Sequence, residues 1–388
     1  MYYSNKLNDQ INITHDKLGK GSFGSVYKAI YNNKEIAIKC ETKEKNNSLS
    51  LLREFKICRK IFMITKYLTF KELLSKEDNS NEENKSILAD YLSNNNIIIH
   101  RHINDNDILL IPNELKENWN IKFIPEMFSY IECNDYNFLT MELCEDNFEN
   151  ILDKNNFDED SKYQLAYYLL NIMSYIHSCG IIHRDIKLSN FVIDKNNKPR
   201  LIDLGLSKEY YKYENNKVLP INSYQIKSIT GTIRYISLNI HALNSPNIND
   251  DLISLCYCLV VIFTGKNLPW VGHKKDTVKF EIDHHTHENC NCGYHKNKKN
   301  NNLKLNTIAE IKYHTSLEEL TEYKYPFLLK WIKYLYSLKS KQMPSYNLLL
   351  KILSNEYNNF KDIKNFKMNF IKKNLLSKIN NKTSNEKI

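Results

Sequence analysis

Residues 183–190 read His-Arg-Asp-Ile-Lys-Leu-Ser-Asn, and residues 201–205 read Leu-Ile-Asp-Leu-Gly. The rest of the chain is organised around these two stretches, and a short hairpin is expected between them. The apolar run at 191–193 and the polar turn at 195–198 indicate a short β-hairpin. Such a hairpin holds the polar residues of the two stretches on adjacent loops.

Four of these polar residues suit phosphoryl transfer. Asp185 can accept the proton of an attacking hydroxyl, and Lys187 can neutralise charge on the phosphoryl group that moves. Asn190 and Asp203 offer oxygen ligands for a metal ion on the phosphates. Ordinary solvated loops can also carry such residues. The spacing of lysine and asparagine after His-Arg-Asp is uncommon, however, and it favours a catalytic function.

Length, charge and cysteine content restrict the class of protein. The chain has 388 residues, which is enough for two lobes with a substantial core. A net charge of +9 fits acidic or phosphorylated protein substrates or nucleic acid, and equally a generally lysine-rich surface. Nine scattered cysteines and an N-terminus without a signal-peptide core predict an intracellular protein, cytoplasmic or nuclear or both. The longest apolar run, 252–263, is too short to cross a bilayer and predicts a buried helix.

The first part of the chain contains a glycine-rich turn. Residues 14–41 predict three strands, and Gly19, Gly21 and Gly24 lie between the first two. Glycines let a backbone close over phosphate groups. A Rossmann turn with the same glycine spacing leads into a helix, whereas β-type sequence follows here. The turn is therefore expected to cover phosphates within a sheet.

A lysine and a glutamate follow this turn. Lys39 stands in Ala-Ile-Lys on the third strand and is expected to reach the phosphates that the turn covers. Glu54 lies in the middle of a predicted amphipathic helix over residues 48–61 and is its expected ion-pair partner. The alternatives are an exposed strand lysine and a solvated helix glutamate.

Three later motifs occur together and in order. Residues 231–241 follow Gly-Thr-x-Arg-Tyr-x-Ser-x-Asn-x-His, residues 250–255 follow Asp-Asp-Leu-x-Ser-Leu, and residues 268–270 read Leu-Pro-Trp. With these motifs the chain resembles the casein kinase 1 family of eukaryotic-type Ser/Thr protein kinases. The vaccinia-related kinases are the nearest alternative subgroup. The resemblance covers about residues 14–61, 122–282 and 307–360.

The resemblance implies an α+β fold with two lobes. A small β-rich N-lobe would span residues 14–143, with an insertion at about 62–121. A larger, mainly helical C-lobe would span residues 144–360, with a second insertion at about 283–305. The basic residues 361–388 are expected to form a loose tail.

The resemblance also implies a Ser/Thr kinase that uses ATP and Mg2+. Its nucleotide-binding residues would be Gly19, Gly21, Gly24, Val26, Ala37, Lys39, Glu142 and Cys144. Asp185, Lys187, Lys39 and Glu54 would serve catalysis, and Asn190 and Asp203 would hold the metal. Lys227 and Arg234 would form an anion site for acidic or phosphate-primed substrates. Asp251 would tie down the backbone around His183–Arg184.

Some positions depart from the family. Leu204 replaces phenylalanine after the metal-binding aspartate, and Cys256 replaces glycine. Ile248–Asn249 replaces the basic pair that usually precedes Asp-Asp. Val278 stands where the family has the third basic residue of the anion site, although Lys274 and Lys279 lie close by. These changes reduce positive charge near the substrate and weaken the inference that it prefers primed substrates.

The second insertion is rich in histidine and cysteine. Zinc could bind to a set drawn from His284, His287, Cys290, Cys292 and His295, although only one residue separates the cysteines. A mobile loop of biased composition is the alternative. Two further alternatives for the whole chain are a pseudokinase scaffold and a module that binds metal or nucleic acid through this insertion. We expect protein substrates, no membrane span, no nucleic-acid partner and a monomer.

Overall fold

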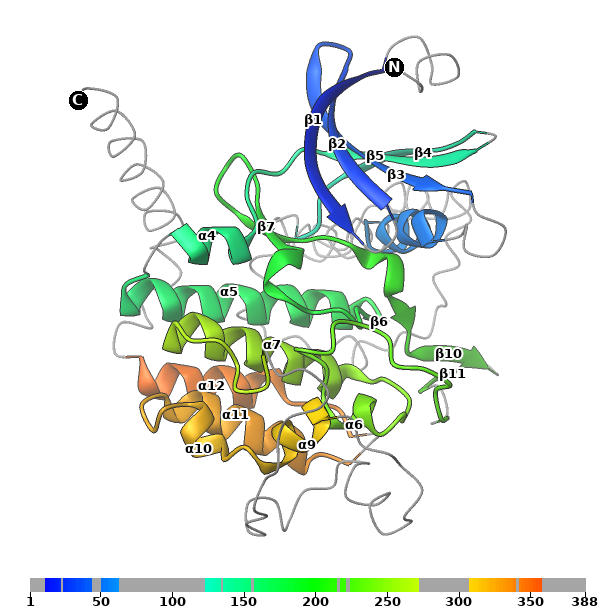
Figure 1. Ribbon diagram of the computed structural model, residues 1–388. Helices are drawn as coiled ribbons and strands as arrows, with labels where there is room; N and C mark the ends of the chain where they lie inside the picture. The colour runs from blue at the N-terminus through cyan, green and yellow to red at the C-terminus, as the bar shows by residue number, and fades with distance from the viewer. Residues whose placement is uncertain are drawn as a thin grey trace, which may run out of the picture. The chain divides into compact units, whose positions relative to one another are not determined.

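A computed structural model describes the protein over residues 11–21, 24–43, 50–62, 123–133, 135–154, 157–214, 217–220, 224–271, 307–339 and 342–357. The chain divides into two compact units. The N-terminal unit consists of Met1–Glu145, Arg200–Ser207 and Tyr211–Leu219. The C-terminal unit consists of Asp146–Pro199, Lys208–Tyr210 and Pro220–Ile388. Figure 1 labels their elements.

The N-terminal unit contains a five-stranded antiparallel sheet of order β1-β2-β3-β5-β4. Its strands are β1 (Ile11–Gly21), β2 (Gly24–Tyr31), β3 (Lys34–Thr42), β4 (Met127–Glu132) and β5 (Tyr136–Glu142). The three strands predicted in residues 14–41 are confirmed.

Asn32 and Asn33 form the turn between β2 and β3. Both have positive φ, at 47° and 58°. A two-residue hairpin turn needs this conformation at both positions, and asparagine adopts it more readily than most residues. The turn sets the register that pairs Tyr31 with Lys34 and Val26 with Lys39.

The sheet buries a different cluster on each face. Alternate residues of β3 explain this arrangement, because successive side chains of a strand point to opposite faces. Ile36 and Ile38 pack in one cluster, and Ala37 packs in the other with Leu51 of the helix at residues 50–62. The helix expected at 48–61 is therefore present and covers the face that carries Ala37 and Lys39 (Figure 1).

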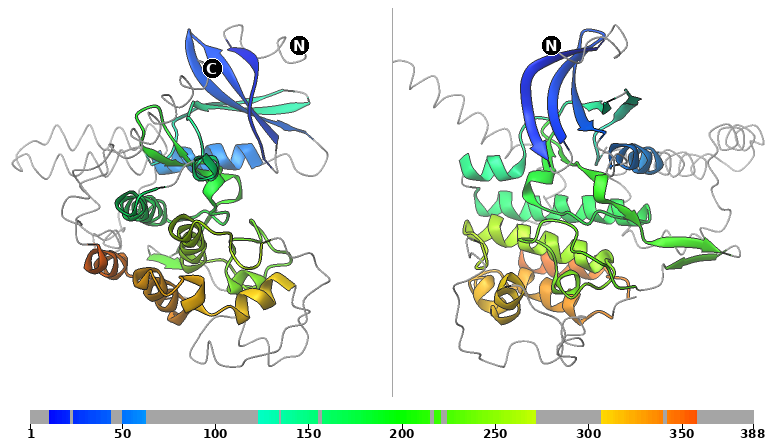
Figure 2. Two further views of the ribbon diagram at one scale, coloured as in Figure 1. Left: turned by 60° about the vertical axis from the view of Figure 1, so that its left-hand side comes forward. Right: turned by 45° about the vertical axis from the view of Figure 1, so that its right-hand side comes forward.

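The C-terminal unit is mainly helical. Its longer helices are α4 (Phe148–Lys154), α5 (Glu159–Ser178), α7 (Ile248–Thr264), α9 (Thr307–His314), α11 (Pro326–Ser337) and α12 (Tyr346–Glu356). Two single-turn helices are α6 (Leu238–His241) and α10 (Leu317–Leu320). The left view of Figure 2 looks nearly along several helices, and it shows them stacked in layers.

Helix α7 lies at the centre of this unit. It packs against both α5 and α11, and almost all of its side chains are buried. The buried helix predicted from the apolar run at 252–263 is confirmed. Among the described residues, no helix combines the length and the apolar character needed to cross a bilayer.

Short elements carry the polar stretches at 183–190 and 201–205. Strands β6 (Ile181–Ile182) and β9 (Lys208–Glu209) pair on either side of them. The 3₁₀ helix η2 (Leu188–Asn190), β7 (Phe191–Ile193), β8 (Pro199–Leu201) and the 3₁₀ helix η3 (Leu204–Leu206) follow in order. Asp194 forms the turn before β8 by accepting hydrogen bonds from the Asn196 and Lys198 N–H groups. The hairpin β10 (Tyr211–Glu214) and β11 (Lys217–Pro220) completes the set.

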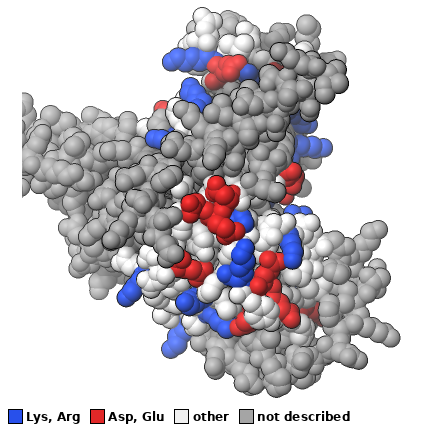
Figure 3. Space-filling view, turned by 90° about the vertical axis from the view of Figure 1, so that its left-hand side faces the viewer, with Lys and Arg blue, Asp and Glu red and all other residues white. Residues whose placement is uncertain are grey.

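Charged side chains of both signs mix on the outer surface. Figure 3 shows acidic and basic groups interspersed on one face. In the C-terminal unit, Lys162 pairs with Glu159, Lys266 with Glu322, and Lys333 with Glu318. These pairs offset part of the positive charge, so net charge alone does not define a basic binding face here.

The N-cap of α5 gives a test of the fold. The Asp158 side chain accepts a hydrogen bond from the Ser161 N–H at 2.8 Å. Asp158→Ala should lower the free energy of unfolding by about 1 kcal/mol, because one helix N–H loses its partner. Denaturant unfolding would measure the change. Asp160→Ala removes a charge from the same helical turn without touching the cap. An equal loss in both variants would contradict the capping role.

Candidate active site

Asp185 is the centre of the polar cluster in the C-terminal unit. Lys187 Nζ lies 2.7 Å from Asp185 Oδ2. The Thr232 N–H and hydroxyl donate to Asp185 Oδ1 at 2.8 and 2.7 Å. Asp185 is buried, so these donors replace the water that a carboxylate would otherwise bind. The result is a carboxylate of fixed orientation with a lysine beside it.

Asn190 is tied to the same residue. Its Nδ2 donates to the Asp185 backbone carbonyl at 2.8 Å. That contact commits the amide nitrogen to the protein, so Oδ1 is the atom that the side chain offers to a ligand. Asp185, Lys187 and Asn190, which the sequence predicted to act together, are therefore neighbours in the structure.

Asp251 at the start of α7 supports this loop from beneath. Its two oxygens accept the backbone N–H groups of His183 at 2.6 Å and Arg184 at 2.8 Å. His177 Nε2 lies 3.1 Å from Asp251 Oδ2, and Tyr346 hydrogen-bonds the other nitrogen of that ring. Burial acts to raise the Asp251 pKa, but the hydrogen bonds and nearby histidines hold it below its ordinary value. The tie between Asp251 and His183–Arg184 expected from the sequence is confirmed.

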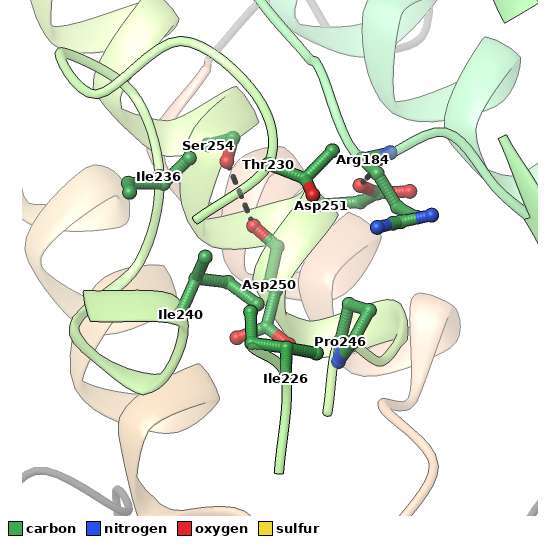
Figure 4. A pocket seen from close by; sticks show the side chains of 9 residues that line it. All are labelled: Arg184, Ile226, Thr230, Ile236, Ile240, Pro246, Asp250, Asp251 and Ser254. Carbon is green, nitrogen blue, oxygen red and sulfur yellow. Dashed lines mark hydrogen bonds between the residues drawn. The ribbon is translucent and has the colours of Figure 1, made fainter. Parts of the chain in front are cut away.

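The backbone next to Asp185 is strained. Arg184 has a φ of 72°, which non-glycine residues rarely adopt. Strain of this kind persists only where the surroundings enforce it, and it gathers at functional sites. The Arg184 side chain lines a small pocket together with Thr230 and Ile236 (Figure 4). The structure thus places Arg184 beside the segment that contains Thr232.

Gly231 lets that segment approach the catalytic loop. Its φ is +97°, and a Cβ atom there would lie 2.4 Å from the Arg184 carbonyl oxygen. Any side chain at this position would push the two backbones apart. The contact of Thr232 with Asp185 therefore depends on glycine at 231.

The N-terminal unit holds the second polar cluster. Lys39 Nζ lies 2.8 Å from Glu54 Oε2 and 2.6 Å from Asp203 Oδ1. Glu54 is only 1% exposed, and Lys39 is also buried. Burial acts to lower the Lys39 pKa, but the two carboxylates outweigh it and raise the pKa above its ordinary value. The Lys39–Glu54 ion pair expected from the sequence is present, and Asp203 joins it.

The other predicted nucleotide residues fall around the same sheet. Val26, Ala37 and Met141 belong to one apolar cluster, which also includes Leu143. Glu142 ends β5, where its N–H donates to the Glu126 carbonyl. Cys144 follows it, half-buried.

The glycines of the turn differ in what they do. A Cβ on Gly24 would lie 1.8 Å from the Cys40 carbonyl oxygen, so packing of β2 against β3 already requires glycine. A Cβ on Gly19 would meet nothing within 4 Å. Packing therefore explains Gly24, whereas the neighbouring strand does not explain Gly19.

The proposed anion residues have different surroundings. Lys227 is exposed. Arg234 Nη1 lies 3.5 Å from Glu149 Oε1 on α4, so a carboxylate of the protein already faces it. Sequence reasoning missed Glu149 as well as Thr232. The Gly-Thr pair was visible as a motif, but nothing in it indicated a contact with Asp185.

Several predictions fall outside the described residues. These include most of the insertion at 62–121, the insertion at 283–305 and the tail at 361–388. The zinc set of His284, His287, Cys290, Cys292 and His295 lies there too, and it stays a prediction. Within the described ranges, no group of three or more His, Cys, Asp or Glu residues is placed to hold a metal ion.

Comparison with known families adds the final observation. A model of the protein kinase domain matches residues 97–356, well over half of the chain. This chain belongs to the protein kinase domain family. The expected α+β fold, with a β-rich part and a helical part, is confirmed as that of a eukaryotic-type kinase. The match begins after Lys39 and Glu54, so the structure supplies the geometry of that pair independently.

A protein kinase transfers phosphate from ATP to protein and uses Mg2+. The residues present fit this metal. Mg2+ prefers carboxylate and carbonyl oxygens together with substrate phosphates. Asp203 offers a partly exposed carboxylate, and Asn190 offers Oδ1 because its nitrogen is engaged with Asp185.

Asp251→Asn tests the support of the catalytic loop. One carboxylate oxygen becomes an NH2 group, and at least one buried contact is lost. The free energy of unfolding should fall by about 3 kcal/mol, as for a broken buried charged contact, and kinase activity should disappear. The stabilisation from Asp251 exists above its unfolded-state pKa of about 3.9. It is lost as the pH falls through the lower folded-state pKa.

Urea unfolding at pH 7 and a phosphoryl-transfer assay would check this prediction. Asp153→Asn, on the exposed side of α4, is the matched control. A fully active and stable Asp251→Asn protein would show that the loop holds its shape without this carboxylate.

Proposed function

We propose that this kinase is a Ser/Thr protein kinase of casein kinase 1 type. It would transfer the γ-phosphoryl group of ATP to protein hydroxyls near acidic or phosphorylated residues. The observation that carries the proposal is the double contact of Thr232 with Asp185 opposite Lys187. Thr232 holds Oδ1 of the Asp185 carboxylate, and Lys187 holds Oδ2. In this proposal the substrate-side segment is the stretch at 231–241 that contains Thr232.

Each polar residue has a role in this proposal. Asp185 accepts the proton of the substrate hydroxyl while the oxygen of that hydroxyl attacks the γ-phosphorus of ATP. Lys187 stabilises the charge on the phosphoryl group in transit. In the N-terminal unit, Lys39 binds the ATP phosphates, and Glu54 orients the Lys39 side chain through their ion pair. Asn190 and Asp203 would hold Mg2+, which supplies positive charge on the phosphates.

Support for the casein kinase 1 type comes from how its motif residues interlock. Ser237 Oγ donates to Asp250 Oδ1 at 2.6 Å, and Asn239 Nδ2 donates to Asp250 Oδ2 at 3.0 Å. Asp250 Oδ2 also accepts the Asn247 N–H in the capping box of α7. The motif at 231–241 and the Asp-Asp motif are thus two halves of one buried hydrogen-bond network. This gives a physical reason for them to occur together.

Support for an acidic substrate comes from Arg234. Its guanidinium can grip a carboxylate or phosphate with two parallel hydrogen bonds. Glu149 at 3.5 Å is part of the same surface and competes for it. An acidic or phosphorylated residue of a substrate would have to displace the Glu149 carboxylate from Arg234. The preference for acidic over neutral substrates is therefore expected to be moderate.

Radiolabelled ATP with casein and a primed acidic peptide tests the proposed function. The wild type should label both on serine or threonine, as shown by phosphoamino acid analysis. Asp203→Asn should abolish the labelling with little unfolding, since Asp203 lies on a loop and serves the metal. Labelling on tyrosine alone would overturn the Ser/Thr assignment. Near-normal turnover by Asp203→Asn would overturn the metal role.

A pair of variants tests substrate choice. Arg234→Ala should lower kcat/KM for the acidic peptide about tenfold, the value of one partly exposed charge-assisted contact. Glu149→Gln removes the competing carboxylate and should raise it by about two- to fivefold. A neutral peptide serves as the control for both variants. Equal changes on the acidic and neutral peptides would mean that Arg234 supports the segment and does not read substrate charge.

A further inference from the structure

Lys312 on α9 is a buried lysine that the proposed mechanism does not use. It is 3% exposed. Its Nζ donates to the Ile233 carbonyl at 2.8 Å and to the Ile236 carbonyl at 2.6 Å. Long charged side chains are almost never buried to this degree without a specific partner. Here the partners are the backbone of the segment that begins at Thr232.

Two aromatic rings lie close to the Lys312 ammonium. Its ammonium lies 5.3 Å from the Tyr257 ring centroid and 5.2 Å from the Trp270 ring centroid. Within the described part of the chain it makes no ion pair. Burial lowers its pKa well below the ordinary value. Even a neutral amine keeps two N–H donors, so both carbonyl contacts survive in either protonation state.

Trp270 holds the carbonyl between those two contacts. Its indole Nε1 donates to the Arg234 carbonyl at 2.7 Å. Ile233, Arg234 and Ile236 thus each give a carbonyl oxygen to a buried side chain. Within the segment, the Tyr235 and Ile236 N–H groups donate to the Thr232 carbonyl. The turn is therefore held by hydrogen bonds among its own backbone groups and by hydrogen bonds from the buried side chains of Lys312 and Trp270.

Thr232 stands at the start of this clamped turn. Its N–H and hydroxyl reach Asp185, so the position of the turn sets the contact with the catalytic carboxylate. Ile233 is 41% exposed and Arg234 is partly exposed, so the same turn presents side chains to a substrate. A shift of the turn would change both the Asp185 contact and the presented surface.

We propose that Lys312 is a positioning residue that holds the 232–236 turn in the conformation that binds the protein substrate. The inference deepens the proposed function, since it rests on the role given to Asp185 and the segment beside it. A buried lysine is a costly way to gain stability alone, because apolar replacements of buried charged groups are often neutral or stabilising. Its value here lies in directing donors at two particular carbonyls.

Lys312→Met is the central test. Methionine matches the length of the lysine stem and packs well against aromatic rings, but it donates no hydrogen bond. We expect the KM for the peptide substrate to rise about tenfold or more, a loss on the scale of leaving a buried carbonyl without its donor. The KM for ATP should change less than about threefold. Lys312→Arg retains the donors and should lie closer to the wild type than Lys312→Met.

A second measurement does not depend on activity. Hydrogen exchange of the Tyr235 and Ile236 amides should be about tenfold faster in Lys312→Met, because the turn opens more readily. Amides of α5 report on global stability and should be unaffected. Lys333→Met, which removes an exposed lysine paired with Glu318, is the matched control and should change neither readout. If Lys312→Met does not fold, Trp270→Phe removes the neighbouring clamp and should act in the same direction.

The outcomes separate this inference from the proposed function. An inactive wild type would refute the proposed function, and exchange at Tyr235 and Ile236 would still decide the role of Lys312. Unchanged peptide KM and unchanged exchange in Lys312→Met would overturn the inference. An equal rise in the KM for peptide and for ATP would also overturn it, since that result indicates a general loss of structure.

Discussion

The loop that carries Asp185 depends on one buried carboxylate. Asp251 binds the N–H groups of two consecutive residues, His183 and Arg184, immediately before Asp185. Those N–H groups belong to a strained stretch that cannot satisfy them by regular structure. An acceptor with two oxygens on the first turn of a buried helix satisfies both at once, and α7 anchors it firmly. The direction in which Asp185 points therefore follows from the packing of α7.

Polar networks extend this rigid centre outward. His177 joins Asp251 to α5, and Tyr346 joins His177 to α12. Asp250, the neighbour of Asp251, joins α7 to Ser237 and Asn239. Buried networks that satisfy every member fix one conformation, because a shift of any part leaves a polar group without a partner. Two adjacent aspartates thus link the catalytic loop, the substrate-side segment and three helices.

Local sequence signals revealed the first three strands, the helix at 48–61 and the short hairpin at 191–201. The apolar run at 252–263 predicted a buried helix, and Lys39 and Glu54 form the ion pair expected of them. Contacts that depend on tertiary path were not visible. Lys312 resembled any helix lysine, and Glu149 resembled any acidic residue of a short helix. Only the fold brings Lys312 under two carbonyls more than seventy residues away, and only the fold turns Glu149 toward Arg234.

The contacts that fix the path of the segment after Gly231 are made mainly with its backbone atoms. Gly231 is required by the approach to the Arg184 carbonyl, and Lys312 and Trp270 grip carbonyl oxygens. None of these contacts reads the side chain of Ile233 or Arg234. The backbone path of the turn and the side chains that it exposes are consequently separable. In the proposed function, substitutions at 233 and 234 would change the surface offered to a substrate, while the contacts made by Lys312 and Trp270 with the backbone would remain.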